Sequence, residues 1–166
     1  MAGILLKGTP VNTSGNLPAE GAKAPDFSLT NTDLEPVSLS SYAGKRLVLN
    51  IFPSLDTGVC AASVKRFNTE AEKLADTMVL CISKDLPFAQ KRFCGTEGLN
   101  SLVMLSGFRD ANFGKDYGVE MTDGPLQELY SRAVVVLDES GVVLHAQQVP
   151  EIAQEPDYDA VLAVLR

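Results

Sequence analysis

Two short apolar runs, at residues 47–52 and 78–83, flank a segment whose apolar residues recur at helical spacing. Each run is continuous rather than alternating, which is typical of strands buried on both faces of a sheet. The segment between them places four apolar residues on one helical face: Val64, Phe67, Ala71 and Leu74. A strand, a helix and a second strand in this order normally form a parallel pair with a right-handed crossover. The sequence therefore predicts an α/β fold around a sheet that is at least partly parallel.

The patterns outside this unit predict a mixed central sheet with flanking helices and an N-terminal β-hairpin extension. Strands or hairpins are expected over residues 4–11, 27–39, 102–105 and 133–147, and helices over residues 61–75, 85–94, 110–117 and 157–165. The second helix should take Asp85 as its N-cap and carry Pro87 in its first turn, with Gly95 and Gly98 as stop signals. No repeat, low-complexity tract or linker divides the chain, so residues 1–166 are expected to form one domain.

Charge and composition narrow the class of protein. Lys and Arg number 14 and Asp and Glu number 21, so the net charge is −7 and the pI is about 4.7. Such a chain is a poor ligand for nucleic acid or an anionic membrane, because both carry negative charge. The apolar stretch at residues 4–6 is too short for a signal-peptide core, and no segment approaches a membrane span. We therefore expect a cytoplasmic protein, whose three cysteines are redox-active or buried rather than a structural disulfide framework.

Cys60 ends the segment 53–60, PSLDTGVC, which lies between the first buried strand and the following helix. A thiol in the first turn of a helix meets unpaired backbone N–H groups and the positive end of the helix dipole, which favour the thiolate. Thr57 brings a hydroxyl that can donate to the sulfur or to an oxygen approaching it, and Pro53 offers a rigid wall against bulk water. A buried structural cysteine is the commonest alternative. The exposed turn marked by Asp56 and Gly58 favours a reactive thiol instead.

Arg132 immediately precedes the apolar strand at 133–137 and is the candidate cation for this thiol. Side chains at strand ends line the sites of open α/β sheets, and a planar guanidinium can hold a thiolate and an oxygen atom together. From position alone, a solvated surface arginine is an equal alternative. The other arginines considered lack this context and are expected on the surface: Arg46, Arg66, Arg92 and Arg109.

A second cysteine would have to capture the sulfenic acid that oxidation of Cys60 produces. Cys81 lies in the middle of a fully buried strand pattern, which favours an inert core residue. Cys94 lies near the end of a short helix followed by glycines, and such an element unwinds at small cost. The residues favour Cys94 without requiring that it touch Cys60 in the reduced fold.

No metal, nucleotide or cofactor site is indicated. His145 is the only histidine and is expected on the exposed face of a hairpin, and the chain has no Cys-x-x-Cys pair and no glycine-rich phosphate loop. Four aromatic residues near the proposed thiol segments are expected mainly in the core: Phe52, Phe88, Phe93 and Tyr130.

The pattern Pro-x-x-x-Thr-x-x-Cys in the segment 53–60 resembles the active-site signature of the peroxiredoxins. The segments 85–90, DLPFAQ, and 93–95, FCG, are similar to the thiol peroxidase branch of that family, and the likeness runs through essentially the whole chain. The resemblance implies a thioredoxin-like fold. It also implies that Cys60 is the peroxidatic thiol and that Cys94 is the resolving thiol, which forms an intrachain disulfide with Cys60. Three neighbours would take part in catalysis: Thr57, Arg132 and Pro53.

The same resemblance implies a peroxidase that needs no metal, haem or flavin. Its substrates would be hydrogen peroxide and organic hydroperoxides, the latter favoured by an apolar rim around the thiol. A thioredoxin-like protein would reduce the disulfide, and the chain would form a homodimer across a face beside the active site.

Two other functions use the same residues differently. A monothiol disulfide oxidoreductase would react through the segment 60–63, CAAS, but Arg132 stands where thioredoxin-like folds usually place a cis-proline. A redox-regulated binding module or holdase would react with an oxidant once, without turnover.

Overall fold

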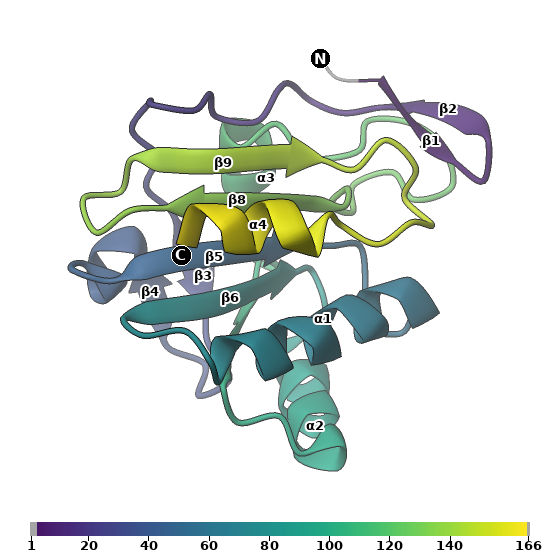
Figure 1. The fold of residues 1–166 in the computed structure, drawn as a ribbon. Helices are drawn as coiled ribbons and strands as arrows, with labels where there is room; N and C mark the ends of the chain where they lie inside the picture. Colours follow the sequence, from purple (N-terminus) through teal and green to yellow (C-terminus); the bar gives the residue numbers. More distant parts are fainter. Residues whose placement is uncertain (1–2, 166) are drawn as a thin grey trace.

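The computed structural model describes residues 3–165, which form a mixed sheet of seven strands and a separate sheet of two (Figure 1). The order in the large sheet is β4-β3-β7-β6-β5-β8-β9, and β1 pairs with β2 in the small one. The strands are β1 Gly3–Leu6, β2 Thr9–Asn12, β3 Ser28–Thr30, β4 Pro36–Ser38, β5 Arg46–Ile51, β6 Thr77–Ser83, β7 Leu102–Ser106, β8 Ala133–Leu137 and β9 Val143–Gln148. The helices are η1 Leu39–Tyr42, α1 Gly58–Ala71, α2 Pro87–Glu97, α3 Phe113–Asp116 and α4 Tyr158–Leu165.

The strand–helix–strand unit is present as expected. β5, β6 and β7 run parallel to one another, and α1 connects β5 to β6. β8 runs antiparallel to β5 and β9 antiparallel to β8, whereas the hairpin β3–β4 joins the opposite edge by pairing antiparallel with β7. The predicted α/β fold with a mixed central sheet is therefore confirmed. That the hairpin β3–β4 belongs to the main sheet was not apparent from its sequence.

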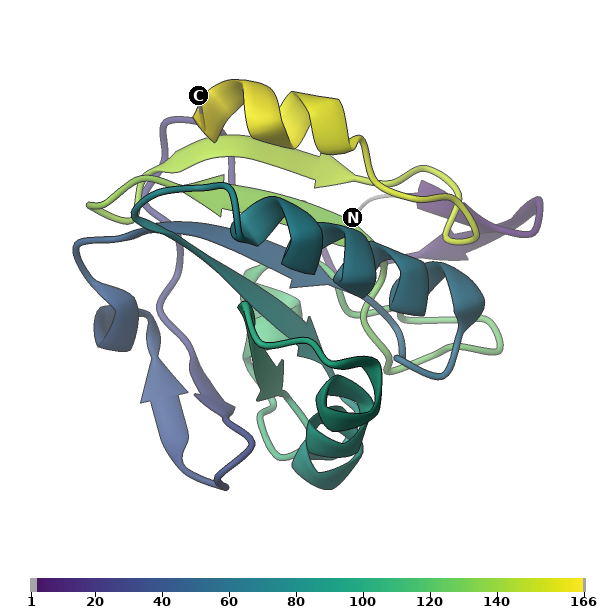
Figure 2. The ribbon, with the colours of Figure 1, turned by 60° about the horizontal axis from the view of Figure 1, so that its bottom comes forward.

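Two apolar layers cover the faces of the large sheet. Successive strand residues point to opposite faces, so Leu49 and Leu80 belong to one cluster while Val48 and Val79 belong to the other. α1, α2 and α4 lie over one face of the sheet and α3 over the other (Figures 1 and 2). Side chains of α1, α2 and α4 pack into the second cluster, and α3 contributes to the first. Within residues 3–165, no helix is both long enough and apolar enough to cross a membrane.

The segments that carry the candidate site lie at one end of the strands, which is called the site edge of the sheet. Ile51, near the end of β5, pairs with Ile82 on one side and with Ala133 on the other. Because β5, β6 and β7 are parallel and end on the same side of the sheet, where the antiparallel β8 begins, Arg132 lies on the side from which the chain continues after β5. The register of four strands thus places Arg132 beside the chain that leads to Cys60.

Several element boundaries differ from those expected. α1 begins at Gly58 and ends at Ala71, so Cys60 is its third residue. α2 takes Leu86 rather than Asp85 as its N-cap and continues past Cys94 to Glu97. Asp85 does not cap because its carboxylate accepts hydrogen bonds from the segment that precedes α1.

Local features accompany two further boundaries. α2 ends at Gly98, whose φ of 67° lies in the left-handed region that glycine adopts without strain. α3 is shorter than expected at both ends: its N-cap is Asn112 and its C-cap is Tyr117, and the N–H of its first residue, Phe113, donates to the Asp110 carboxylate over 2.8 Å.

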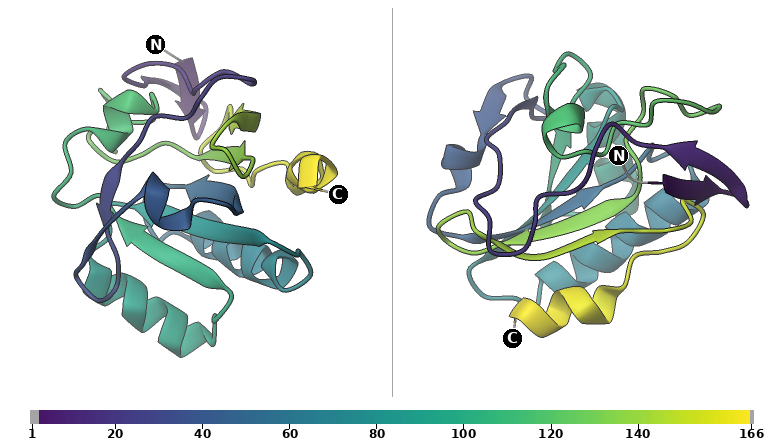
Figure 3. Two further views of the ribbon diagram at one scale, coloured as in Figure 1. Left: turned by 90° about the vertical axis from the view of Figure 1, so that its left-hand side faces the viewer. Right: turned by 90° about the horizontal axis from the view of Figure 1, so that it is seen from above.

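The N-terminal hairpin β1–β2 docks on the segment that follows β9 (Figure 3). The Leu5 N–H donates to the Pro150 carbonyl over 2.8 Å, and the Ile152 N–H donates to the Leu5 carbonyl over 2.9 Å. The Glu151 carboxylate accepts hydrogen bonds from the N–H groups of Lys7 and Gly8. The hairpin extension therefore fixes the position of Ile152, whose carbonyl faces the candidate site.

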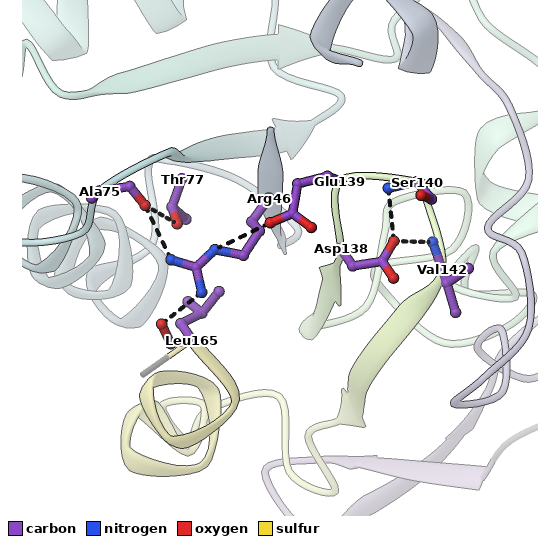
Figure 4. A network of polar contacts seen from close by, with 8 residues as sticks. All are labelled: Arg46, Ala75, Thr77, Asp138, Glu139, Ser140, Val142 and Leu165. Carbon is purple, nitrogen blue, oxygen red and sulfur yellow. Dashed lines mark hydrogen bonds and ion pairs between the residues drawn. The ribbon is translucent and has the colours of Figure 1, made fainter. Parts of the chain in front are cut away.

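Arg46 is an exception to the expectation that the remaining arginines are on the surface (Figure 4). Its guanidinium donates to the carbonyls of Leu165 and Ala75 over 2.7 and 3.0 Å and lies 4.0 Å from the Glu139 carboxylate. It thereby joins the start of β5, the end of α4 and the turn after β8, at the opposite end of the sheet from Cys60. Three arginines are exposed as expected: Arg66, Arg92 and Arg109.

Candidate active site

Cys60 lies beneath an exposed turn and is itself fully buried. The first helical hydrogen bond of α1 runs from the Ala61 N–H to the Thr57 carbonyl over 3.0 Å. The N–H groups of Gly58, Val59 and Cys60 therefore have no acceptor within the helix and are available to a negative charge at its start. Burial restricts the thiol to small reactants, while the helix start supplies donors for a negative charge.

Arg132 lies directly against the thiol. Its Nη2 donates to Cys60 Sγ over 3.1 Å, and its Nε donates to the Ile152 carbonyl over 2.7 Å. The side chain is 2% exposed, and among residues 3–165 its Nη1 has no hydrogen-bond partner. A buried, charged donor without an acceptor is costly. This nitrogen is therefore available to an oxygen that enters beside the sulfur.

Thr57 is used differently from the way its sequence position suggests. Its hydroxyl donates to the Ser54 carbonyl over 3.0 Å, and it is exposed rather than turned onto the sulfur. In this arrangement the Thr57 proton is therefore donated to the turn and not to Cys60 Sγ, while its oxygen can accept a hydrogen bond. Pro53 is buried between the end of β5 and this turn, consistent with a wall beside the thiol.

Asp85 is a component of the site, and its predicted role as the N-cap of α2 is wrong. Its carboxylate accepts hydrogen bonds of 2.8 Å from the Ser54 hydroxyl, 2.8 Å from the Leu55 N–H and 2.7 Å from the Ser83 hydroxyl. These bonds fasten the turn before Cys60 to the connection between β6 and α2. The available signal was the position of Asp85 just after a buried strand, at the same sheet edge as Ser54.

Cys94 lies on α2 and is half-buried, packed against the same apolar cluster as Cys60. Burial raises the pKa of the Cys94 thiol above its ordinary value of 9.0. All three cysteines are free thiols. The structure therefore holds the reduced arrangement, with the two cysteine-bearing helices on one face of the sheet.

Cys81 lies below α1, on β6. Burial raises the pKa of its thiol to about 12, against the opposing effect of a hydrogen bond from Asn50. Asn50 also donates to the Ser63 hydroxyl over 3.4 Å, which in turn donates to the Cys60 carbonyl over 2.9 Å. Cys81 therefore belongs to a buried polar chain that supports the backbone of Cys60, and it stays protonated near neutral pH.

The other residues singled out from the sequence fall in different places. Phe52 and Tyr130 are buried as expected, Phe93 is half-buried, and Phe88 is 67% exposed. His145 is half-buried rather than exposed. No cluster of three or more His, Cys, Asp and Glu side chains within residues 3–165 is arranged to hold a metal ion.

Comparison with known proteins bears on this arrangement. A family model described as Redoxin matches residues 19–162. The thiol peroxidases of Mycobacterium bovis and Mycobacterium tuberculosis are each 54% identical to the chain over 165 residues, which cover 99% of this chain and 99% of theirs.

Two solved structures share the fold over nearly the whole chain. The peroxiredoxin-like protein from Aquifex aeolicus has a TM-score of 0.93 at 36% identity and covers 99% of this chain and 96% of its own. The thiol peroxidase from Chromobacterium violaceum has a TM-score of 0.90 at 23% identity, covers 98% and 94%, and supports the fold alone. The chain belongs to the redoxin family, in its thiol peroxidase branch.

Proposed function

We propose that the chain is a thiol-dependent peroxidase that reduces hydrogen peroxide and organic hydroperoxides through Cys60. The observation that carries the proposal is the 3.1 Å contact between Arg132 Nη2 and Cys60 Sγ at the start of α1. A permanent cation and free helix N–H groups at a buried sulfur stabilise the negative charge that peroxide reduction moves through the site.

In the first step, the Cys60 thiolate attacks the terminal oxygen of the hydroperoxide. A sulfur–oxygen bond forms as the oxygen–oxygen bond breaks, and the leaving oxygen takes up a proton to depart as water or an alcohol. Cys60 becomes a sulfenic acid. Arg132 Nη1 binds the reacting oxygens while Nη2 holds the sulfur, and the Thr57 hydroxyl oxygen accepts a hydrogen bond from the peroxide O–H. That proton stays on the oxygen transferred to sulfur, while the leaving oxygen takes its proton from water. Pro53 keeps bulk water from the thiolate.

In the second step, the Cys94 thiol condenses with the sulfenic acid, forming a Cys60–Cys94 disulfide and releasing water. A thioredoxin-like dithiol protein then reduces this disulfide to two thiols and is itself oxidised. The packing of both cysteines against one apolar cluster supports the pairing. The reducing cytoplasm, which keeps dithiol proteins reduced, is the compartment that fits this cycle.

A homodimer is the assembly that fits the surface beside the site. Leu86, Phe88 and Phe108 are 50%, 67% and 41% exposed and follow the ends of β6 and β7, at the sheet edge that carries Cys60. Exposed apolar side chains that gather in this way are typical of protein interfaces. Sedimentation of wild type against Phe88→Ser tests the assembly, and a wild-type monomer at micromolar concentration would refute it.

The peroxidase itself is tested by a thioredoxin-coupled assay across several hydroperoxides. Cys60→Ser should abolish turnover, because a serine hydroxyl is scarcely ionised near neutral pH while the shape of the site is kept. Cys81→Ser, the matched control, should keep most of it. An active Cys60→Ser together with an inactive Cys81→Ser would overturn the assignment. Insulin reduction without peroxide consumption would indicate a disulfide oxidoreductase, and a single reaction without turnover would indicate a redox-regulated binding module.

A further inference from the structure

Asp85 connects the two segments that carry Cys60 and Cys94. Its Oδ1 accepts from the Ser54 hydroxyl over 2.8 Å, and its Oδ2 accepts from the Leu55 N–H and the Ser83 hydroxyl over 2.8 and 2.7 Å. Ser54 and Leu55 belong to the turn that leads to Cys60. Asp85 itself precedes α2, the helix of Cys94, by two residues.

The connection is anchored on the α2 side by further buried bonds. The Ser106 hydroxyl donates to the Asp85 carbonyl over 2.6 Å. The Gln90 amide, fully buried on α2, donates to the Ser83 hydroxyl and to the Leu105 carbonyl over 3.3 and 3.0 Å. The first half of α2 is therefore tied to the sheet, and the turn before Cys60 is tied to α2 through one carboxylate.

We propose that Asp85 is a positioning residue whose carboxylate latches the turn before Cys60 in place while the thiol reacts with peroxide, and whose release allows Cys60 and Cys94 to meet. The proposal rests on the proposed function for the roles of the two cysteines. The Asp85 latch is defined here as the three hydrogen bonds from Ser54, Leu55 and Ser83.

The chemistry makes opposite demands on the turn. Peroxide reduction requires Cys60 at Arg132, which is the closed arrangement. Condensation of Cys60–SOH with Cys94–SH yields a disulfide and water, and a disulfide needs Cα atoms within about 7 Å of each other. Two cysteines held within separate helices reach that distance by local unfolding. The rate of condensation therefore scales with the open fraction, and the rate of peroxide reduction with the closed fraction.

Weakening the latch has a distinctive consequence because the closed state predominates. A large relative increase in the small open population of the turn scarcely changes the population that is closed. Asp85→Asn should therefore leave peroxide reduction by Cys60 within about twofold while it accelerates disulfide formation about 10- to 100-fold, the worth of one hydrogen bond to a charged acceptor. The yield of Cys60 sulfinic acid at a given peroxide concentration should fall by the same factor. A substitution that merely damaged the site would slow both steps.

Amide exchange in the reduced protein, without peroxide, tests the latch independently of catalysis. Asp85→Asn replaces one accepting oxygen with an NH₂ group, so exchange over residues 52–64 should be about 10- to 100-fold faster. Exchange over residues 86–97 should rise by less, because the bonds from Ser106 and Gln90 stay in place. Asp138→Asn is the matched control, because its carboxylate also holds a turn through hydrogen bonds, here from two backbone N–H groups, of 2.8 Å from Ser140 and 2.9 Å from Val142, in the β8–β9 turn far from Cys60 (Figure 4). It should leave both segments unchanged.

Ser54→Ala keeps the proposal testable should Asp85→Asn fail to fold. It removes the bond from the Ser54 hydroxyl to Asp85, together with the bond that this hydroxyl accepts from the Asp56 N–H, and it keeps the bond from the Leu55 N–H. It should raise exchange over 52–64 in the same direction by a smaller factor. Unchanged exchange in both variants, or peroxide reduction and disulfide formation slowed together, overturns the latch. Failure of the proposed function is separate: it would appear as peroxidase turnover in Cys60→Ser, whatever the exchange rates.

Discussion

Cys60 and Cys94 lie on helices that cover the same face of one sheet, yet their surroundings differ in the way they are held. Cys60 is fully buried, with a guanidinium nitrogen 3.1 Å from its sulfur. Cys94 is half-buried near the end of a helix whose last residues are exposed and which stops at Gly98. The environment of Cys60 is therefore suited to a fixed geometry, and that of Cys94 to movement.

The contacts that hold the two regions differ in the same way. Arg132 is held by the Ile152 carbonyl, which is held in turn by the N-terminal hairpin through Leu5. The end of α2 is linked to α1 by an exposed ion pair of 3.2 Å between Lys65 and Glu97. Exposed pairs of this kind contribute about 0–1 kcal/mol. Opening the Cys94 region therefore costs less than displacing Arg132.

The largest expected effect is that oxidation unfolds both the Cys60 and the Cys94 regions, so that the difference between them disappears. On oxidation by peroxide, residues 57–64 and 88–95 should lose helical protection together while the sheet keeps its protection, because the disulfide cannot form between intact helices. Peroxide should yield an intrachain disulfide in a monomer-sized species on non-reducing gels. Cys94→Ser should lose this species entirely and accumulate Cys60 sulfenic and sulfinic acids.

Amide exchange on the reduced and oxidised forms provides the direct comparison. Equal protection of both segments in the two forms, or a Cys60–Cys81 bond identified by mass spectrometry, would contradict this account of the two regions.

The next effect probes the fixed geometry around Cys60. Arg132→Ala should slow the reaction of Cys60 with peroxide by roughly 100- to 1,000-fold, the loss typical of removing a donor to the transition state. Arg132→Lys should restore little, because a compact ammonium cannot contact Cys60 and a second atom in one plane while bonding to Ile152. Stopped-flow measurement of the first oxidation step tests both variants. Wild-type rates in both variants would remove Arg132 from the chemistry.

The fold of the first region was accessible from sequence because its signals are local and periodic. Continuous apolar runs at 47–52 and 78–83 predicted buried strands, and the helical stripe beginning at Val64 predicted their crossover. The position of Arg132 at a strand start predicted its edge of the sheet. The hydrogen bond to Cys60 itself depends on the register of β5 with β8, which the local pattern does not encode.

The remaining differences arise where a side chain bonds far along the chain. Asp85 looked like a helix cap, but it accepts from Ser54 and Leu55 across the sheet edge. Arg46 looked like a surface residue, but it bonds to Leu165 at the far end of the chain. In both cases the local preference was overridden by a tertiary partner that becomes visible only once the strands are placed.

A smaller effect is the difference in the rate of alkylation between the other two thiols, Cys94 and Cys81. Burial raises the pKa of Cys94 above 9.0 and that of Cys81 to about 12. Because the thiolate is the reactive form, alkylation of Cys94 in folded Cys60→Ser should be slow at neutral pH and accelerate as the pH rises, whereas Cys81 should react only on unfolding. Mass spectrometry of the labelled protein shows the order in which the two cysteines are alkylated. Labelling of Cys81 before Cys94 would refute it.

The smallest effect concerns the distant support of Arg132. Partial desolvation acts to raise the pKa of Glu151, but hydrogen bonds from the N–H groups of Lys7, Gly8 and Ala153 outweigh it and hold that pKa below 4.5. A carboxylate with a lowered pKa stabilises the fold above its unfolded pKa, and the contribution is lost as the pH falls through the folded value. The docking of the hairpin β1–β2 should therefore loosen below about pH 4.5, and Glu151→Gln should remove this pH dependence.

Amide exchange of the hairpin, measured across this pH range, follows the loss of its docking as Glu151 becomes protonated. The rate of the first oxidation step in Glu151→Gln at neutral pH shows whether this docking affects Arg132. We expect a slowing of less than about threefold, since removal of a support acts on Arg132 only through Ile152. Asp123→Asn is the matched control: its carboxylate accepts from the N–H and side-chain amide of Asn12 on the other strand of the same hairpin. It should loosen the hairpin without slowing oxidation. Equal slowing in both variants would show that the hairpin acts on the whole fold rather than through the segment that holds Arg132.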